Sequence, residues 1–138
     1  MKKWHLAVAI LIGLIFLVGV AVWARYVDML NVLKHDTKRW AVIEDINGNR
    51  IAVEPVSNHA WSELVELSQN GTRKWIGGIV ERYDNKWGFR FKPDTVIVAE
   101  VTAEGLQAAI EYISTHIDYW LNSWAYVSAK VAEVHSET

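Results

Sequence analysis

Residues 6–24 read LAVAILIGLIFLVGVAVWA, nineteen residues without a charged or strongly polar side chain. A helix rises 1.5 Å per residue, so this stretch would span about 28 Å, close to the roughly 30 Å hydrocarbon core of a bilayer. Trp4 and Trp23 flank it, and such amphipathic rings prefer the depth of the lipid headgroups. The pattern predicts a transmembrane helix that anchors the rest of the chain.

A cleaved signal peptide is the alternative interpretation of the same stretch. Lys2 and Lys3 provide a short basic start, and Gly19-Val20-Ala21 fits a small-x-small cleavage signal. The apolar run is longer than the roughly 7–15 residues that are usual in the core of a signal peptide. We therefore expect an anchor that is retained.

The orientation of the anchor depends on the basic residues on its two sides. Lys2 and Lys3 favour a cytoplasmic N-terminus, whereas four basic residues after the run favour the reverse. These four are Arg25, Lys34, Lys38 and Arg39. Because a short basic start before one long apolar run is typical of a signal anchor, we expect a cell-membrane protein with a cytoplasmic N-terminus and an extracytoplasmic domain.

The segment after the anchor, residues 25–35, keeps apolar side chains at helical spacing. The helix is therefore expected to continue to about His35. An apolar stripe outside the membrane needs a partner surface, either the chain's own domain or another subunit. The candidate interface residues are Trp23, Tyr26, Met29, Leu30, Leu33 and Trp124.

Composition restricts the function classes. The chain has 138 residues and no Cys, so it has room for one small domain and no disulfide or thiolate site. From Thr37 onward, ten Lys and Arg face fourteen Asp and Glu, an excess of acid that repels phosphate and argues against nucleic acid. No spacing of the five His predicts a metal site, and no cofactor motif is present. We expect neither a metal nor a cofactor.

Residues 37–138 predict one extracytoplasmic α+β domain after an anchor unit of residues 1–35. The hairpin is the clearest part, with strands 39–45 and 50–54 joined by Asn47-Gly48, which we expect in a type I′ turn. The other expected elements are a helix over 60–68, strands over 75–83, 87–92 and a buried 95–101, a long helix over 102–121, and a strand over 124–134, for which a continued helix is the alternative. Gly77-Gly78 marks a bulge or a close backbone approach. Together they predict a two-layer domain, with a mostly antiparallel sheet and two helices on one face.

Part of the domain resembles a known family. The residues concerned are Trp87-Gly88-Phe89, Pro93-Asp94-Thr95-Val96, Glu100 and Glu104, and His116-Ile117-Asp118-Tyr119-Trp120. Residues 77–120 are similar to the small N-terminal domain of calmodulin-binding-protein-like proteins, which are mainly secreted or surface-exposed. The resemblance implies the fold and an extracytoplasmic setting. The family's Cys after the second glutamate and its Cys-Pro-Trp element are absent, and we do not carry over calmodulin binding.

Four polar residues form the candidate polar site: Glu100, Glu104, His116 and Asp118. The carboxylate pair could serve acid–base chemistry or hold a hard cation. The structural alternative places Glu104 in the first turn of the long helix and pairs Glu100 with a cation such as Arg90. His116 and Asp118 could bind a metal or a polar ligand, or His116 could pack near the end of its helix. We favour the structural alternative for both pairs.

The aromatic residues admit three interpretations: a core, an interface or membrane belt, or a ligand groove. They include Trp75, Trp87, Phe89, Phe91, Trp120 and Trp124. No catalytic motif is present. We therefore predict a non-catalytic single-pass accessory or structural subunit of a membrane protein complex, for example a membrane oxidoreductase or monooxygenase assembly, with lipid and other subunits as partners. A membrane-anchored or secreted binding module is the alternative, and Asn70-Gly71-Thr72 would be a glycosylation sequon only outside the cell.

Overall fold

The computed structural model describes residues 2–137, without the side chains of Lys2, Asp28 and Met29. The side chain of Met29, one of the predicted interface residues, thus lies outside the described part. The chain divides into two compact units, Met1–Asn31 and Val32–Thr138. The first unit is almost entirely one helix, and the second is an α+β domain.

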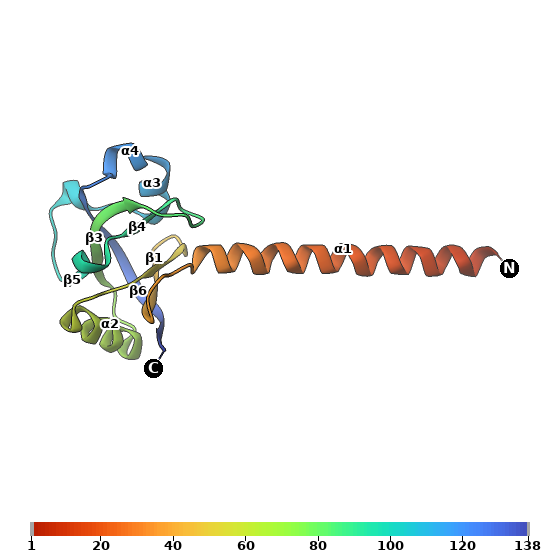
Figure 1. Ribbon diagram of the computed structural model, residues 1–138, viewed down its shortest axis with the longest axis horizontal. Helices are drawn as coiled ribbons and strands as arrows, with labels where there is room; N and C mark the ends of the chain where they lie inside the picture. Colours follow the sequence, from red (N-terminus) through yellow and green to blue (C-terminus); the bar gives the residue numbers. More distant parts are fainter. Residues whose placement is uncertain (1, 138) are drawn as a thin grey trace. The chain divides into compact units, whose positions relative to one another are not determined.

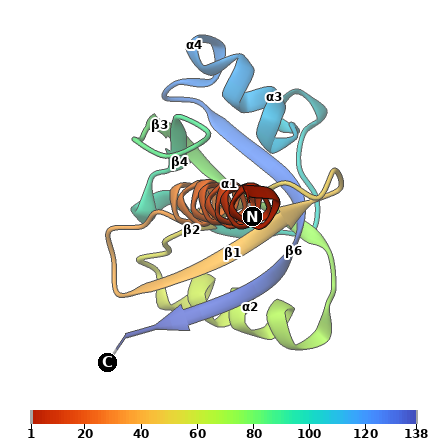
Figure 2. The same ribbon diagram turned by 90° about the vertical axis from the view of Figure 1, so that its right-hand side faces the viewer.

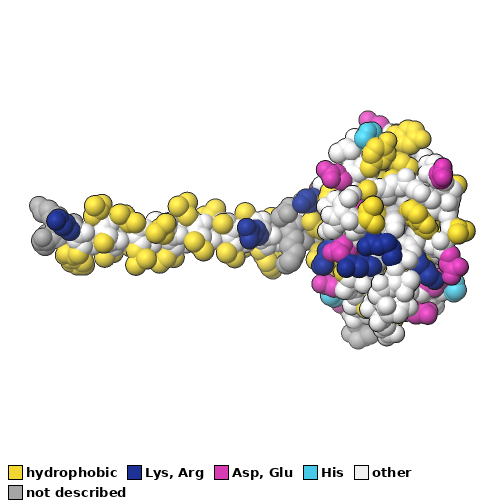
Figure 3. All heavy atoms as spheres, turned by 180° about the vertical axis from the view of Figure 1, so that it is seen from behind, with side chains coloured by type: hydrophobic (Ala, Val, Ile, Leu, Met, Phe, Trp, Pro, Cys, Tyr) yellow, Lys and Arg dark blue, Asp and Glu magenta, His cyan; other side chains and the backbone are white. Residues whose placement is uncertain are grey.

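Helix α1 runs from Lys2 to Val32, so the predicted helix is present but ends three residues before His35. Its described side chains are exposed, apart from the half-buried Val32 at its end. Figure 3 shows apolar side chains covering it, with basic groups among them. The helix is long and apolar enough to cross a membrane, a test that an N-terminal signal sequence also passes.

An antiparallel sheet of six strands forms the domain (Figures 1 and 2). The strands are β1 (Arg39–Asp45), β2 (Arg50–Val53), β3 (Lys74–Arg82), β4 (Phe89–Phe91), β5 (Ile97–Ala99) and β6 (Trp124–Ser136). Their order is β2-β1-β6-β3-β4, and β5 also pairs with β3. The indole N–H of Trp87 donates to the Arg50 carbonyl at 2.7 Å, so the sheet curls and brings the two outer strands β2 and β4 toward each other.

The hairpin of β1 and β2 is confirmed, but its turn is not type I′. That turn needs positive φ at both central residues. Gly48 has φ of 81°, whereas Asn122 is the one non-glycine residue with positive φ in the described part of the chain. The Asp45 carboxylate instead accepts the backbone N–H groups of Asn47 and Asn49, each at 3.0 Å, and closes a longer loop around itself.

Helix α2 (Asn58–Asn70) extends a little beyond the predicted 60–68. The Ser57 hydroxyl caps its start by accepting the Ala60 N–H at 3.3 Å. Gly71 ends it in the left-handed conformation, with φ of 69°. The apolar side chains of Leu64 and Leu67 are buried in the core.

The predicted long helix over 102–121 is wrong. This region contains a 3₁₀ turn η2 (Glu104–Leu106) and two short helices, α3 (Ile110–Thr115) and α4 (Ile117–Trp120). Between η2 and α3 the chain runs beside β6, where the Ala108 N–H donates to the Tyr126 carbonyl at 3.0 Å. His116 then breaks the helix with φ of −127° and ψ of 39°. Tertiary pairing has overridden the helical spacing of the apolar residues.

The predicted buried strand over 95–101 is also wrong in extent and environment. Residues Pro93–Thr95 form a 3₁₀ turn, η1, and only Ile97–Ala99 form strand β5. Ile97 is 38% exposed, because β5 lies outside the main order of the sheet and pairs with β3 alone. The Thr95 hydroxyl explains the turn, since it donates to the Lys92 carbonyl at 2.7 Å and accepts the Ile79 N–H at 2.9 Å.

One main core joins the inner face of the sheet to the helices. Leu64 of α2 and Ile110 of α3 are both fully buried in it, together with Phe89, Phe91 and residues from β1, β2, β3 and β6. The α+β class is therefore confirmed. A Cβ on Gly77 would overlap the backbone of Ala125, so the predicted close approach is real and explains the glycine.

Candidate functional site

The two glutamates of the candidate polar site each have a separate environment. Glu100 follows β5, and its carboxylate pairs with Lys74 at 3.6 Å rather than with Arg90. Its side chain is 83% exposed. Glu104 begins the 3₁₀ turn η2, not a long helix. No described contact joins these two residues, within residues 2–137, to each other or to His116 and Asp118.

His116 and Asp118 line a shallow hollow of about 520 Å³ between α3, α4 and the end of β3. The Asp118 carboxylate pairs with Arg82 at 2.9 Å, and His116 stacks on Tyr112 with ring centroids 4.2 Å apart. His116 Nδ1 lies 2.9 Å from the Tyr112 carbonyl. His116 thus packs where α3 ends, as the structural alternative expects, and its side chain already has two local partners, Tyr112 and Thr115.

The candidate interface residues fall into different environments. Trp23, Tyr26 and Leu30 are exposed on α1. Leu33 packs against Trp40, Val42 and Ala52 on the outer face of the sheet, so the domain itself is its partner. Trp124 is 37% exposed and stacks beside Tyr126, with ring centroids 6.1 Å apart.

An ion cluster of Asp36, Glu54, Glu81 and Arg90 surrounds one buried carboxylate, that of Glu54, after which we call it the buried ion cluster; the Asp36 side chain is 59% exposed. Glu54 is 2% exposed. One carboxylate oxygen accepts the backbone N–H groups of Asp36 at 2.6 Å and Thr37 at 2.9 Å. The other accepts Arg90 Nη1 at 2.9 Å. Glu54 therefore fixes the segment that follows α1 in sequence, Leu33–Thr37, to the sheet.

Arg90 completes the buried ion cluster from β4. Its Nε donates to Glu81 at 2.8 Å and its Nη1 to Asp36 at 3.1 Å. Burial alone would lower the pKa of Arg90, but its hydrogen bonds to Glu81 and Glu54 outweigh burial and raise it above the usual value. The guanidinium is charged at any physiological pH, so the cluster holds Asp36 and Thr37 to Glu54 and β4 at all such pH values; we call this set of contacts the clamp.

Tyr83 lies over this clamp. Its ring centroid is 4.3 Å from the Arg90 guanidinium carbon, and its hydroxyl donates to Asp36 at 2.9 Å. Burial, and then the hydrogen bond and negative charge of Asp36, raise the pKa of Tyr83 to about 12. The hydroxyl stays protonated as a donor at neutral pH.

Sequence reasoning missed this cluster. Glu54 lies at the end of a predicted strand with no role assigned to it, and Arg90, inside another predicted strand, is considered only as a partner for Glu100. The available signal was the alternation of Phe89, Arg90 and Phe91, which places one cation on the face opposite two buried rings. Its partner could not be found without the pairing of distant strands.

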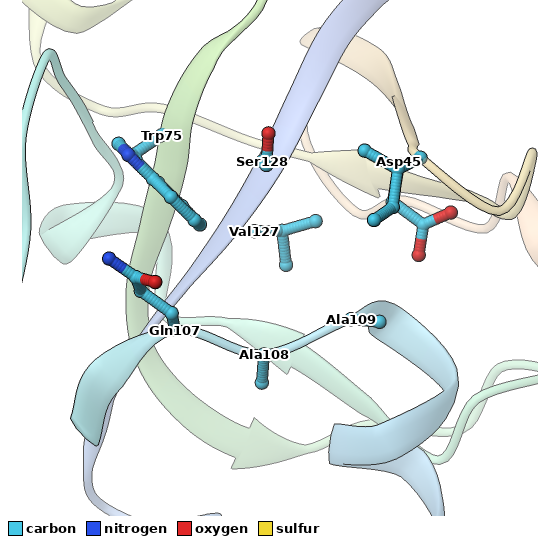
Figure 4. Close-up of a pocket in the computed structure, with 8 residues that line it drawn as sticks. Asp45, Trp75, Gln107, Ala108, Ala109, Val127 and Ser128 are labelled. Atoms are coloured by element: carbon cyan, nitrogen blue, oxygen red, sulfur yellow. The ribbon is translucent and has the colours of Figure 1, made fainter. Parts of the chain in front are cut away.

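An apolar hollow of about 210 Å³ lies elsewhere, beside β6. Figure 4 shows Trp75 of β3 on one side, Asp45 of β1 on the other, and Val127, Ala108 and Ala109 between them. The hollow lies between the end of β1 and residues 107–109, the stretch that runs beside β6 before α3. The Asp45 carboxylate is already engaged within the domain, because its oxygens accept the backbone N–H groups of Asn47, Asn49 and Ile110.

The described residues, 2–137, contain no group of three or more His, Asp or Glu placed to hold a metal ion. Comparisons with protein-family models, curated proteins and solved structures find no match for the chain. The resemblance of residues 77–120 to calmodulin-binding-protein-like proteins stays a prediction. The features that bear on function are therefore α1 and the surface of the domain.

Proposed function

We propose that the chain is a single-pass membrane protein whose domain is a non-catalytic accessory subunit of a membrane protein complex. The observation that carries the proposal is α1, a helix of 31 residues with exposed apolar side chains. In water such an apolar surface would make the chains associate with one another, whereas in a bilayer the apolar lipid tails solvate it. The helix satisfies its own backbone hydrogen bonds, as a membrane span requires.

The polar residues of the domain support a non-catalytic role. Glu54 and Arg90 are engaged in holding Leu33–Thr37, and Asp45 is engaged in holding a loop and the start of α3. Glu100 and Asp118, the acids that the sequence suggested for a site, pair with cations at the surface. A general acid or base must be within hydrogen-bond reach of its substrate, whereas the contacts of these groups are made within the domain.

We place the N-terminus in the cytoplasm and the domain outside. Lys2 and Lys3 before the apolar helix support this orientation. The resemblance of residues 77–120 to a mainly secreted or surface-exposed family supports it independently. The domain's partners would then be lipid and the extracytoplasmic parts of other membrane subunits.

Membrane insertion and complex formation are tested by two separate measurements on the full chain in its native cells. Wild-type protein should remain in the membrane pellet after an alkaline wash, and the double variant Leu14→Lys/Ile15→Lys should not. Leu14→Ala/Ile15→Ala is the matched control and should remain. After mild detergent extraction, the wild type should migrate well above its own 15.7 kDa. Migration as a lone monomer would contradict the accessory-subunit role.

A binding module for a protein or a small ligand is the second candidate. The apolar hollow beside β6 favours it, because concave apolar sites are where ligands and side chains of partners bind. The two candidates differ in what they need from the membrane. A binding module would keep its ligand when detached from α1, whereas an accessory subunit depends on its complex.

A further inference from the structure

Two hollows adjoin on the domain and form what we call the paired hollow. The first is the apolar hollow beside β6, of about 210 Å³. The second, of about 290 Å³, is lined by Asn47, Ala109, Glu111, Tyr112 and Thr115. Ala109 lines both, and Ile46 of the first precedes Asn47 of the second. A single ligand group can therefore extend from one into the other.

The first hollow suits an uncharged apolar group. Trp75, Val127 and Ala108 supply its surface, and Ile46, which is 70% exposed, stands at its edge. Engineered apolar cavities of about 150 Å³ accept benzene. The first hollow is therefore large enough for one aromatic ring or one leucine-sized side chain.

The second hollow suits a cation. Glu111 is exposed, and no ion pair or hydrogen bond of its carboxylate is found in the part of the chain that the structure describes. The Tyr112 ring is 51% exposed; His116 stacks on one of its faces, so a cation would contact the opposite face. No Lys or Arg is among the residues that line either hollow. The charge of the second hollow is thus uncompensated.

We propose that the paired hollow binds a partner subunit through an apolar side chain next to a lysine or arginine, the apolar group against Trp75 and the cation against Glu111. This inference rests on the proposed function, because it names the chemistry of the contact with another subunit. Charge complementarity selects this occupant over an acidic one. The buried ion cluster shares no residue with the paired hollow, so the proposed contact does not depend on that cluster.

Fluorine NMR of the full chain in lipid nanodiscs, with fluorotryptophan in place of Trp, tests the proposal. Phenethylammonium is the probe, since it joins an aromatic ring to a cation, and phenylacetate is its anionic counterpart. The Trp75 resonance, assigned with Trp75→Phe, should shift and saturate with phenethylammonium and respond less to phenylacetate. The Trp4 and Trp23 resonances report any partition of the probes into lipid.

Three variants complete the test. Glu111→Gln should weaken phenethylammonium binding about fivefold, the size of a good exposed ion pair. Glu66→Gln, on the exposed side of α2, is the matched control and should leave binding unchanged. Ala109→Leu should block the junction of the hollows and abolish the shift while the melting temperature stays near that of the wild type.

Equal binding of the two probes, no response of Trp75, or an undiminished response in Glu111→Gln would overturn the proposal. Those outcomes would leave the membrane role standing, because pellet retention and native size measure it separately. Conversely, a soluble monomer that binds phenethylammonium as described would retain the paired hollow as a site and contradict the proposed function.

Discussion

Two ion pairs of this domain have the same length and opposite significance. Glu54 and Arg90 approach to 2.9 Å, and so do Asp118 and Arg82. The carboxylate side chain is 2% exposed in the first pair and 94% exposed in the second. Water can replace the partner of Asp118 but not that of Glu54. Burial, rather than distance, decides which pair holds the domain together.

Removing the buried carboxylate should have the largest effect. Glu54→Ala leaves two backbone N–H groups without an acceptor and removes the buried one of the three carboxylates that pair with Arg90. The loss of these hydrogen bonds to a charged group should lower the free energy of unfolding by about 3–5 kcal/mol. Urea unfolding of the full chain, followed by Trp fluorescence, measures it. Glu54→Gln keeps an acceptor for the N–H groups and should cost less. A loss below about 1 kcal/mol for Glu54→Ala would show that the cluster is not a clamp.

Asp45 should come next, since it is buried without a cation. Its carboxylate joins the hairpin loop to the first residue of α3, Ile110, at 3.1 Å. Asp45→Ala should cost about 2–3 kcal/mol, because three hydrogen bonds are lost at about 1 kcal/mol each. Hydrogen exchange should show faster opening of residues 110–115 in Asp45→Ala, and less so in Asp45→Asn. Unchanged exchange of residues 110–115 in Asp45→Ala would show that the hydrogen bond from Ile110 to Asp45 does not stabilise α3.

Tyr83 extends the comparison to pH. Its folded pKa of about 12 lies above the usual value of 10, so the unfolded chain loses this proton first. Stability should therefore fall as pH rises from about 10 to about 12 and be unaffected below that window. Thermal unfolding across this range should show a smaller decline in Tyr83→Phe. An identical pH profile for the variant would mean that Tyr83 does not contribute.

The exposed pair should have the smallest effect. Asp118→Ala should change the free energy of unfolding by no more than about 0.5 kcal/mol, as is usual for solvated ion pairs. The same urea titration used for Glu54 measures it. A loss of unfolding free energy as large as that of Glu54→Ala would show that burial does not decide which ion pair stabilises the domain.

The sequence predicted those parts of the fold that local chemistry determines. Ser57 begins α2 with a side-chain cap and Gly71 ends it in a left-handed backbone conformation, and the alternation of residues 124–134 matches β6. The region over 102–121 failed because its apolar spacing is equally compatible with one helix and with two short helices separated by a stretch beside β6. Contacts with distant residues decide between them, among them the hydrogen bonds from Ala108 to Tyr126 and from Ile110 to Asp45.

The sites divide in the same way. His116 and Asp118 stood out because both belong to one short motif of the resembled family, and the structure places both in one shallow hollow. Glu54 and Arg90 are 36 residues apart and join only when β2 and β4 approach. The paired hollow is assembled from β1, β3, β6 and α3, so no local pattern could reveal it.

The most direct test of the central claim is the state of α1 in the cell. Alkaline extraction of native membranes, followed by intact mass measurement of the extracted protein, reports both retention and cleavage. We predict membrane-bound protein that still carries residues 6–24. Soluble mature protein beginning near Val22, after cleavage at Ala21, would contradict the account.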